Sequence, residues 1–251
     1  MERSLLLVGA RSYVLDSVRR ACEISGVGTH SFGSETSSEV RGYLSLPKIV
    51  AQQDSVLVVA TPGDFRSREG KENYPLNPQV LEFIRENSSK VICLSTIRVG
   101  DHSPAQQAYA EKNLEFETIA LELGARVLRL PNYWGFYPSE HSSQAILAPW
   151  VFLFHDPAWP TFPKRKISFV TPIDLLEKVD TSWFGIAQLE PSLEVSPEDI
   201  HELQRQAKKS LGEKQSSPAN SGSLTSPIDF AVYTLVEHEI RKLGRDVSHA
   251  G

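Results

Sequence analysis

A glycine-containing turn near the N-terminus could bind phosphate. The sequence VGARSYVLDSV begins at the end of the apolar run SLLLVGA and continues into a segment with helical spacing. A dinucleotide-binding turn uses three glycines, for a tight turn, for approach of the backbone to the pyrophosphate and for close helix packing. Here Gly9 is present, while Ser12 and Leu15 occupy the second and third positions. Ser12 can still donate a hydrogen bond to phosphate, whereas Leu15 must push the helix away or pack differently. A plain strand-to-helix turn is the alternative.

The end of the second predicted strand bears on the choice of nucleotide. NAD-binding proteins carry Asp or Glu there to hold the ribose 2′-hydroxyl. This chain has Ser31 and Ser34 in the segment THSFGSE, and Arg11 in the first loop. A guanidinium pairs with a 2′-phosphate through charge-assisted hydrogen bonds, so the sequence favours NADP over NAD. An exposed loop arginine without a ligand is the alternative.

Aromatic residues cluster after the strand at 125–131. The segment NYWGFYP contains Trp134 and Tyr137, and aromatic rings at the end of a strand can stack on a sugar face or on nicotinamide. We therefore expect Trp134 and Tyr137 to contact substrate. The alternative is apolar packing between two lobes. The histidines lack ligand spacing, so no metal site is expected.

Buried strands that alternate with helices must position these residues. Apolar runs and helical patterns take turns along the first half of the chain. We expect strands at 4–10, 27–32, 54–64, 90–96 and 125–131, and helices at 13–26, within 37–53, at 78–89 and at 104–124. This alternation predicts an α/β fold, a Rossmann-like, doubly wound parallel sheet with its ligand crevice at the carboxyl ends of the strands.

The second half of the chain predicts a small C-terminal substrate lobe. We expect a dinucleotide-binding-like core at 1–135 and a lobe at 136–212, interleaved with the last core elements at 165–180. A polar linker rich in Pro, Gly and Ser follows at 213–227, and a helix and tail occupy 228–251.

Composition narrows the class of protein. The net charge is −5 and the basic residues are spread along the chain, so nucleic acid is not an expected partner. The two cysteines, Cys22 and Cys93, are expected to be buried thiols in a reducing compartment. The N-terminal apolar run before Gly9 is too short for a membrane span. We expect a cytoplasmic protein without a membrane partner.

Several segments in order resemble one family. VGARSYVLDSV, VLVVATPGD, VICLSTIRVG, AYAEKNLEFE, VLRLPNYWG and ISFVTPIDLLEKV are similar in order and approximate spacing to the extended short-chain dehydrogenases/reductases. This family includes NAD(P)-dependent sugar-nucleotide epimerases and dehydratases. The resemblance covers roughly residues 4–212 and implies NADP, or NAD, as cofactor.

The resemblance also implies roles for individual residues. The cofactor would contact residues in the first turn, in the predicted strands at 27–32 and 54–64 and in the turn after 130: Gly9, Ala10, Arg11, Ser12, Tyr13, Val14, Ser31, Ala60, Thr61, Pro62, Pro131, Asn132 and Tyr133. Ser95 and Thr96 match the residues that hydrogen-bond the substrate oxygen. Tyr109 matches the tyrosine that gives or takes the proton while hydride moves to or from nicotinamide.

A tyrosine at that position needs a nearby cation. A phenol has a reference pKa near 10, so phenolate must be stabilised by positive charge at neutral pH. The family places a lysine four residues later, where this chain has Asn113, while Lys112 stands at three residues. A rival register puts Lys112 in the lysine position and Ala108 in the tyrosine position, which leaves no proton donor. Glu117 matches an acidic residue of the family, although a solvated helical charge is the favoured interpretation.

Two functions remain open at this point. The first is an NAD(P)-dependent oxidoreductase or epimerase/dehydratase-like enzyme for a small carbonyl, hydroxyl or sugar-derived substrate, with Tyr109, Ser95, Thr96, Lys112 and Asn113 at the catalytic site. The second is a catalytically degenerate dinucleotide-binding sensor or scaffold. The family also implies a possible homodimer through the helices at 78–89 and 104–124.

Overall fold

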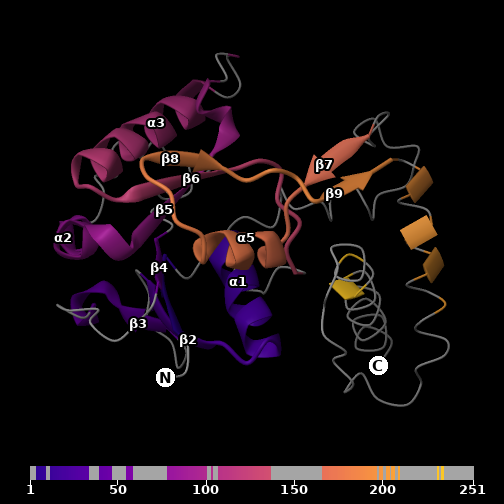
Figure 1. Cartoon of the computed structure of the whole chain (residues 1–251), viewed down its shortest axis with the longest axis horizontal. Coiled ribbons are helices and arrows are strands. Elements are labelled where there is room, and N and C mark those ends of the chain that lie inside the picture. The colour runs from indigo at the N-terminus through magenta and orange to yellow at the C-terminus, as the bar shows by residue number, and fades with distance from the viewer. Residues whose placement is uncertain are drawn as a thin grey trace, which may run out of the picture.

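Seven strands form one parallel sheet in the order β3-β2-β1-β4-β5-β6-β8 (Figure 1). This computed structural model describes residues 4–9, 12–33, 40–46, 55–58, 78–100, 103, 107–136 and 166–196, and single residues 198, 199, 202, 203, 205, 206, 209, 231, 233 and 234. The strands of the sheet are β1 Ser4–Val8, β2 Gly28–Gly33, β3 Val40–Gly42, β4 Ser55–Val58, β5 Val91–Thr96, β6 Arg126–Leu130 and β8 Ile186–Gln188.

Helices cover both faces of this sheet. They are α1 Tyr13–Ile24, α2 Pro78–Asn87, α3 Gln107–Glu122 and α5 Pro172–Val179, with short 3₁₀ helices η1 Tyr43–Ser45, η2 Ser88–Lys90 and η3 Ile97–Gly100. In β1, Leu5 and Leu7 belong to the core under α1 and α5, while Leu6 and Val8 belong to the core under α2 and α3. This alternation is the period of two that a strand imposes on its side chains. The predicted doubly wound parallel sheet is confirmed.

Two of the helices begin at capping residues that the sequence supplies. The Ser12 hydroxyl accepts a hydrogen bond from Leu15 N–H and begins α1. Thr171 and Asp174 form a reciprocal capping box at the start of α5, with Pro172 at the first helical position. Side-chain oxygens of this kind satisfy N–H groups that have no partner within the helix.

A second, two-stranded sheet lies beside the first (Figure 1). β7 Ile167–Phe169 pairs antiparallel with β9 Leu193–Val195. Tyr133, just beyond β6, bridges to Val170, and Trp134 N–H donates to the Val170 carbonyl at 2.8 Å. The turn after β6 is therefore fixed between the two sheets.

One element departs from expectation. The helix predicted within 37–53 is wrong for residues 40–46, which form β3 and η1 instead. β3 pairs with β2 through Ser31–Val40, Phe32–Arg41 and Gly33–Gly42. A short run of apolar residues does not distinguish helix from strand, and pairing with an open sheet edge decided the outcome.

Both cysteines are buried, as expected. Burial raises the pKa of the Cys93 thiol to about 12, which keeps it protonated and unreactive at neutral pH. Among the described helices, none has the length and apolar character needed to cross a membrane.

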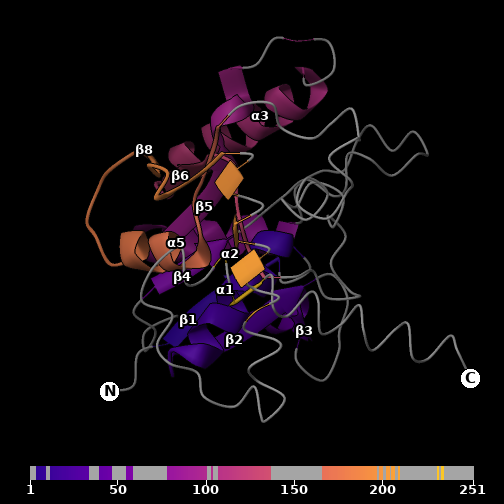
Figure 2. The ribbon, with the colours of Figure 1, turned by 90° about the vertical axis from the view of Figure 1, so that its right-hand side faces the viewer.

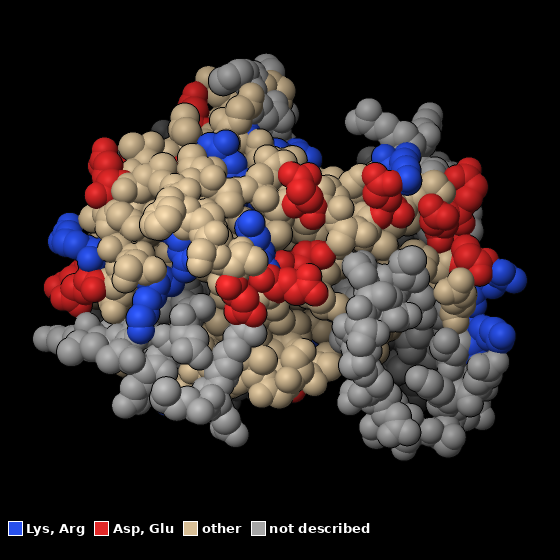
Figure 3. All heavy atoms as spheres, in the orientation of Figure 1, with Lys and Arg blue, Asp and Glu red and all other residues tan. Residues whose placement is uncertain are grey.

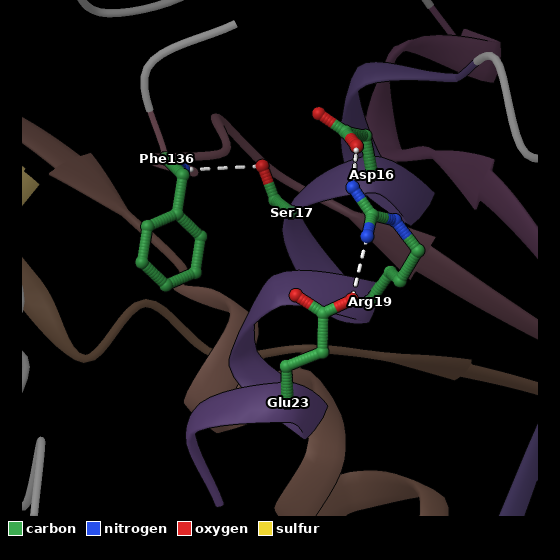
Figure 4. Close-up of polar contacts among 5 residues, drawn as sticks. All are labelled: Asp16, Ser17, Arg19, Glu23 and Phe136. Atoms are coloured by element: carbon green, nitrogen blue, oxygen red, sulfur yellow. Dashed lines mark hydrogen bonds and ion pairs between the residues drawn. The ribbon is translucent and has the colours of Figure 1, made fainter. Parts of the chain in front are cut away.

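Helix α1 and the turn after β6 approach each other at Gly135. A Cβ atom on Gly135 would stand 2.2 Å from Ser17 Oγ and 2.9 Å from a ring carbon of Tyr133. Gly135 N–H donates to Tyr13 Oη at 2.9 Å, and Phe136 N–H donates to Ser17 Oγ at 3.1 Å (Figure 4). Glycine is required here by close approach.

We predict that Gly135→Ala lowers the free energy of unfolding by about 2 kcal/mol, because the added methyl group must displace Ser17 or the backbone. Gly100→Ala is the matched control, since a Cβ there has no neighbour within 4 Å. Urea unfolding followed by tryptophan fluorescence measures both. Equal stability of the two variants would show that the contact between α1 and the turn after β6 accommodates a methyl group without cost.

Candidate functional site

The carboxyl end of β5 presents two hydroxyl groups with different surroundings. Ser95 follows Val91 and Cys93 on the side of the sheet that α2 and α3 cover. It is 8% exposed, and within the described structure its Oγ is buried without a hydrogen-bond partner. Thr96 Oγ1 accepts from Arg98 N–H at 3.2 Å and so stabilises the turn into η3. Ser95 Oγ therefore has no partner among the described residues, whereas Thr96 Oγ1 accepts one hydrogen bond and keeps its O–H free to donate.

Helix α3 turns one face toward the sheet, on which two polar residues stand among apolar ones. Its buried residues are Ala110, Asn113, Phe116, Glu117 and Ala120. Their spacing of three and four residues defines one helical face. Tyr109, partly buried, lies at the N-terminal end of this face, and α3 contacts both β5 and the η3 helix that follows it.

A buried ion pair fixes this face against β6. Glu117 is 1% exposed, and its two carboxylate oxygens accept from Arg129 Nε at 2.9 Å and from Arg129 Nη2 at 2.6 Å. Hydrogen bonding to Glu117 raises the pKa of Arg129. The expectation of a solvated charge at Glu117 is therefore wrong. Arg129 stands opposite Ser95 in the β5–β6 register, so the ion pair lies next to the candidate site.

Asn113 is placed between Tyr109 and Glu117. Its Nδ2 donates to the Tyr109 carbonyl at 2.7 Å, and the residue is buried. Counted back from the paired Glu117, four residues lead to Asn113 and eight to Tyr109. Lys112, partly exposed, comes one position earlier, about 100° around the helix from Asn113.

The turn from β1 into α1 begins at a glycine with a positive φ. Gly9 has a φ of 100°, in the region that favours glycine, and its carbonyl accepts from Ser12 N–H at 2.9 Å. Leu15 is fully buried between α1 and the sheet, together with Leu5 and Leu7. Its side chain fills the core, so it does not cover the turn.

Three charged residues of α1, one of them buried, form a chain of ion pairs. Asp16, in the first turn, pairs with Arg19 at 3.0 Å, and Arg19 also pairs with Glu23 at 2.5 Å (Figure 4). A carboxylate in the first turn interacts favourably with the helix dipole. Arg19 offsets part of the negative charge of this carboxylate at the N-terminal end of α1.

The two tyrosines predicted to line the cofactor make structural contacts. Tyr13 and Tyr133 pack edge to face, with ring centroids 5.8 Å apart. Tyr133 Oη donates to the Val14 carbonyl at 3.4 Å, and burial raises the pKa of Tyr133. Asn132 is exposed, and its Nδ2 donates to the Ser168 carbonyl at 3.2 Å. These contacts hold the turn after β6 beside the first turn of α1.

Trp134 is a core residue. It is fully buried, its Nε1 donates to Thr234 Oγ1 at 3.1 Å, and its ring packs edge to face on Phe169. The expectation that Trp134 stacks on substrate is wrong for this conformation, because protein atoms cover the whole indole. Apolar packing, the alternative considered for this segment, explains Trp134.

Ser31 also differs from its expected place. It lies within β2, two residues before the strand ends, and is buried opposite Leu7. A ribose contact requires a side chain at the strand's end. The remaining predicted residues lie outside the described part of the chain: Ala10, Arg11, Ser34, Ala60, Thr61, Pro62 and Tyr137. No cluster of three His, Cys, Asp or Glu that could hold a metal occurs among the residues described.

The fold resembles that of several solved enzymes. The protein CapF of Staphylococcus aureus, which assembles capsular polysaccharide, is 14% identical with a TM-score of 0.55, and the match covers 94% of this chain and 65% of that one. The UDP-N-acetylglucosamine 4-epimerase of Bacillus cereus is 16% identical with a TM-score of 0.54, over 96% of this chain and 99% of the other. The UDP-glucuronic acid 4-epimerase of Bacillus cereus, solved with NAD, is 12% identical with a TM-score of 0.56, over 94% and 96%.

This chain therefore spans less than two thirds of the length of the staphylococcal protein. No protein-family model matches the sequence, and no curated protein matches it. The chain has the fold of the extended short-chain dehydrogenases/reductases, as the order of its motifs predicted.

We predict that Glu117→Ala lowers the free energy of unfolding by about 3 kcal/mol, because it leaves the Arg129 guanidinium without its buried partner. Glu194→Ala, which removes an exposed partner of Lys166, is the control and should change stability little. Denaturant unfolding measures both. If Glu117→Ala were as stable as Glu194→Ala, the pair would not hold α3 in place.

Proposed function

We propose that the protein is an NAD(P)-dependent enzyme of the epimerase, dehydratase or reductase kind that acts on a sugar nucleotide or a related carbonyl or hydroxyl substrate. The observation that carries this proposal is the buried, partnerless hydroxyl of Ser95 at the carboxyl end of β5. Ligands of doubly wound folds bind at this edge of the sheet, and a buried hydroxyl without a partner is costly unless a ligand or water satisfies it.

The residues of the first turn fit a dinucleotide. Gly9 has the conformation for a tight turn, Ser12 begins the helix, and Leu15 is directed into the core. Backbone N–H groups at Tyr13 and Val14 would then face phosphate at the helix N-terminus. The described part of β2 contains no carboxylate, which supports NADP, whereas a structural neighbour was solved with NAD. A bound nicotinamide would supply reversible hydride transfer.

The protein's own residues would handle the proton and the substrate oxygen. Ser95 would orient that oxygen by a hydrogen bond, and Tyr109 would give or take its proton. Lys112, three residues after Tyr109, would supply positive charge that stabilises phenolate. Pro131, Asn132 and Tyr133 would border the nicotinamide side of the crevice.

A second candidate is a dinucleotide-binding sensor or scaffold without hydride chemistry. The neutral side chain of Asn113 favours it, because the family places a lysine at this position. The Asn113 amide is neutral and donates to the Tyr109 carbonyl, so it supplies no positive charge near the phenol. Ligand binding without turnover would distinguish this candidate from the enzyme.

We predict that Tyr109→Phe lowers kcat at least about 100-fold, because it removes the proton donor, while the dissociation constant of NADP or NAD changes less than about threefold. Quenching of tryptophan fluorescence measures cofactor binding, and chromatography of UDP-sugars after incubation measures turnover. Tyr43→Phe, in η1, is the control and should leave both unchanged. Unchanged turnover in Tyr109→Phe would exclude the mechanism, and binding without turnover in the wild type would support the sensor.

We also predict that Asn113→Lys raises kcat about tenfold, because it places positive charge one helical turn from Tyr109. The control is Asn113→Gln, which keeps the amide and lengthens the side chain. Thermal unfolding of both variants checks that the buried site accepts the larger group. A folded Asn113→Lys variant without any gain would show that Lys112 already supplies the charge or that Tyr109 is not the acid.

A further inference from the structure

The turn that joins α5 to β8 exposes large apolar side chains. Phe184 is 97% exposed and Ile186 is 44% exposed, two of the few large hydrophobic residues in the described chain that face solvent to this degree. In Figure 2 this turn lies at the outer edge of the molecule, and Figure 3 shows a broad uncharged surface over it and the start of β8. Gly185, with a φ of 67°, fixes the turn, and its carbonyl accepts from Val127 N–H.

The edge of β8 that faces away from β6 is open within the described sheet. The bonds from Val127 N–H to the Gly185 carbonyl and from Leu189 N–H to the Arg129 carbonyl direct alternate backbone groups toward β6. Because strand residues turn their N–H and C=O groups to the two sides in alternation, those of Ile186 and Gln188 point outward. An open edge of this kind accepts an additional strand.

Two cations stand on one side of this edge. The Arg126 guanidinium carbon lies 4.6 Å from the Trp183 ring centroid, and Lys178 Nζ lies 5.3 Å from the same centroid. In the described part of the chain neither cation forms an ion pair; apart from the ring, Arg126 only donates to the Thr181 carbonyl, at 3.5 Å. Burial lowers the pKa of Arg126, and its Nε and the Trp183 Nε1 are buried without an acceptor. A carboxylate on the outer side would offset this charge.

We propose that β8 and the turn before it form a docking surface for an extended, acidic segment of another protein, which adds to the sheet beside β8. The side chain of Arg126 lies on the same face of the sheet as that of Leu128, the face covered by α1 and α5. Ile186 pairs in register with Val127, so its side chain lies on the opposite face, which α3 covers. The two faces of an added strand therefore meet different surroundings, cationic on one and apolar on the other. A segment in which acidic and apolar residues alternate matches both.

A second copy of this chain fits the surface less well. The exposed side chains of α2 and α3, the helices expected to pair in a homodimer, include Glu82, Glu86, Glu111 and Glu115, with Leu114 as an exposed large apolar residue. These acids lie on helices, so they cannot extend a sheet. The docking surface and the proposed catalytic site also lie apart, because the turn precedes β8 while ligands bind where the strands end.

The test uses a fluorescein-labelled peptide of about ten residues in which Val and Glu alternate, a length that matches one strand. Fluorescence anisotropy measures its binding to the full chain. Two control peptides replace Glu by Lys or place the same Val and Glu residues in two blocks. We expect saturable binding of the alternating acidic peptide, at least about tenfold tighter than either control, and weaker binding at higher salt.

Substitutions in the protein locate the surface. Phe184→Ser and Arg126→Gln should each weaken binding about tenfold, and Leu114→Ser, on α3, is the control that should leave it unchanged. Phe184→Ser removes almost no buried contact, so it should fold normally even if Arg126→Gln does not. No binding, equal binding of the Lys peptide, or an unchanged affinity of Phe184→Ser would overturn the proposal. A dimer in sedimentation that Phe184→Ser dissolves would overturn it too, because the face would then join two copies.

Discussion

The Glu117 carboxylate lies almost entirely out of water between α3 and the sheet, and the Arg129 guanidinium offsets its charge with two hydrogen bonds. A buried charge tolerates little displacement from its partner, because the partner replaces its hydration. The pair therefore fixes both the rotation of α3 and its position along β6. Tyr109 and Asn113 follow from that placement, two turns and one turn along the same face. The position of the Tyr109 phenol therefore depends on the Glu117–Arg129 ion pair, which itself performs no chemistry.

The second constraint is the joint between α1 and the turn after β6. Hydroxyl groups of Tyr13 and Ser17 accept from the backbone of Gly135 and Phe136, so the first helix and a turn more than a hundred residues later form one unit. Trp134 and Phe136 extend this unit toward the C-terminal part of the chain, through Thr234 and Tyr233. The aromatic segment thus connects the core and the small sheet. Its rings pack inside the protein, and the backbone N–H groups of Gly135 and Phe136 bond to α1.

The turn at Gly9 and helix α3 each differ from the pattern of the dinucleotide-binding family, in different ways. Leu15 replaces a glycine at no visible cost, because the core under α1 has room for its side chain. Asn113 replaces a charged group by a neutral amide that bonds to its own helix. The first change leaves the turn at Gly9 intact. The second would alter the electrostatics of the proposed reaction.

The sequence by itself determined the doubly wound sheet, because continuous apolar runs between helical patterns leave only a sheet that is buried on both faces. It also determined the Gly9 turn and the capping of α5, which depend on neighbours a few residues apart. Only the tertiary structure determined that Glu117 and Trp134 are buried and that residues 40–46 form a strand and a 3₁₀ helix. Each depends on a partner distant in the chain: Arg129 in β6, Thr234 near the C-terminus, and the open edge of β2. Local sequence records which groups need partners, but the fold alone decides which partners come within reach.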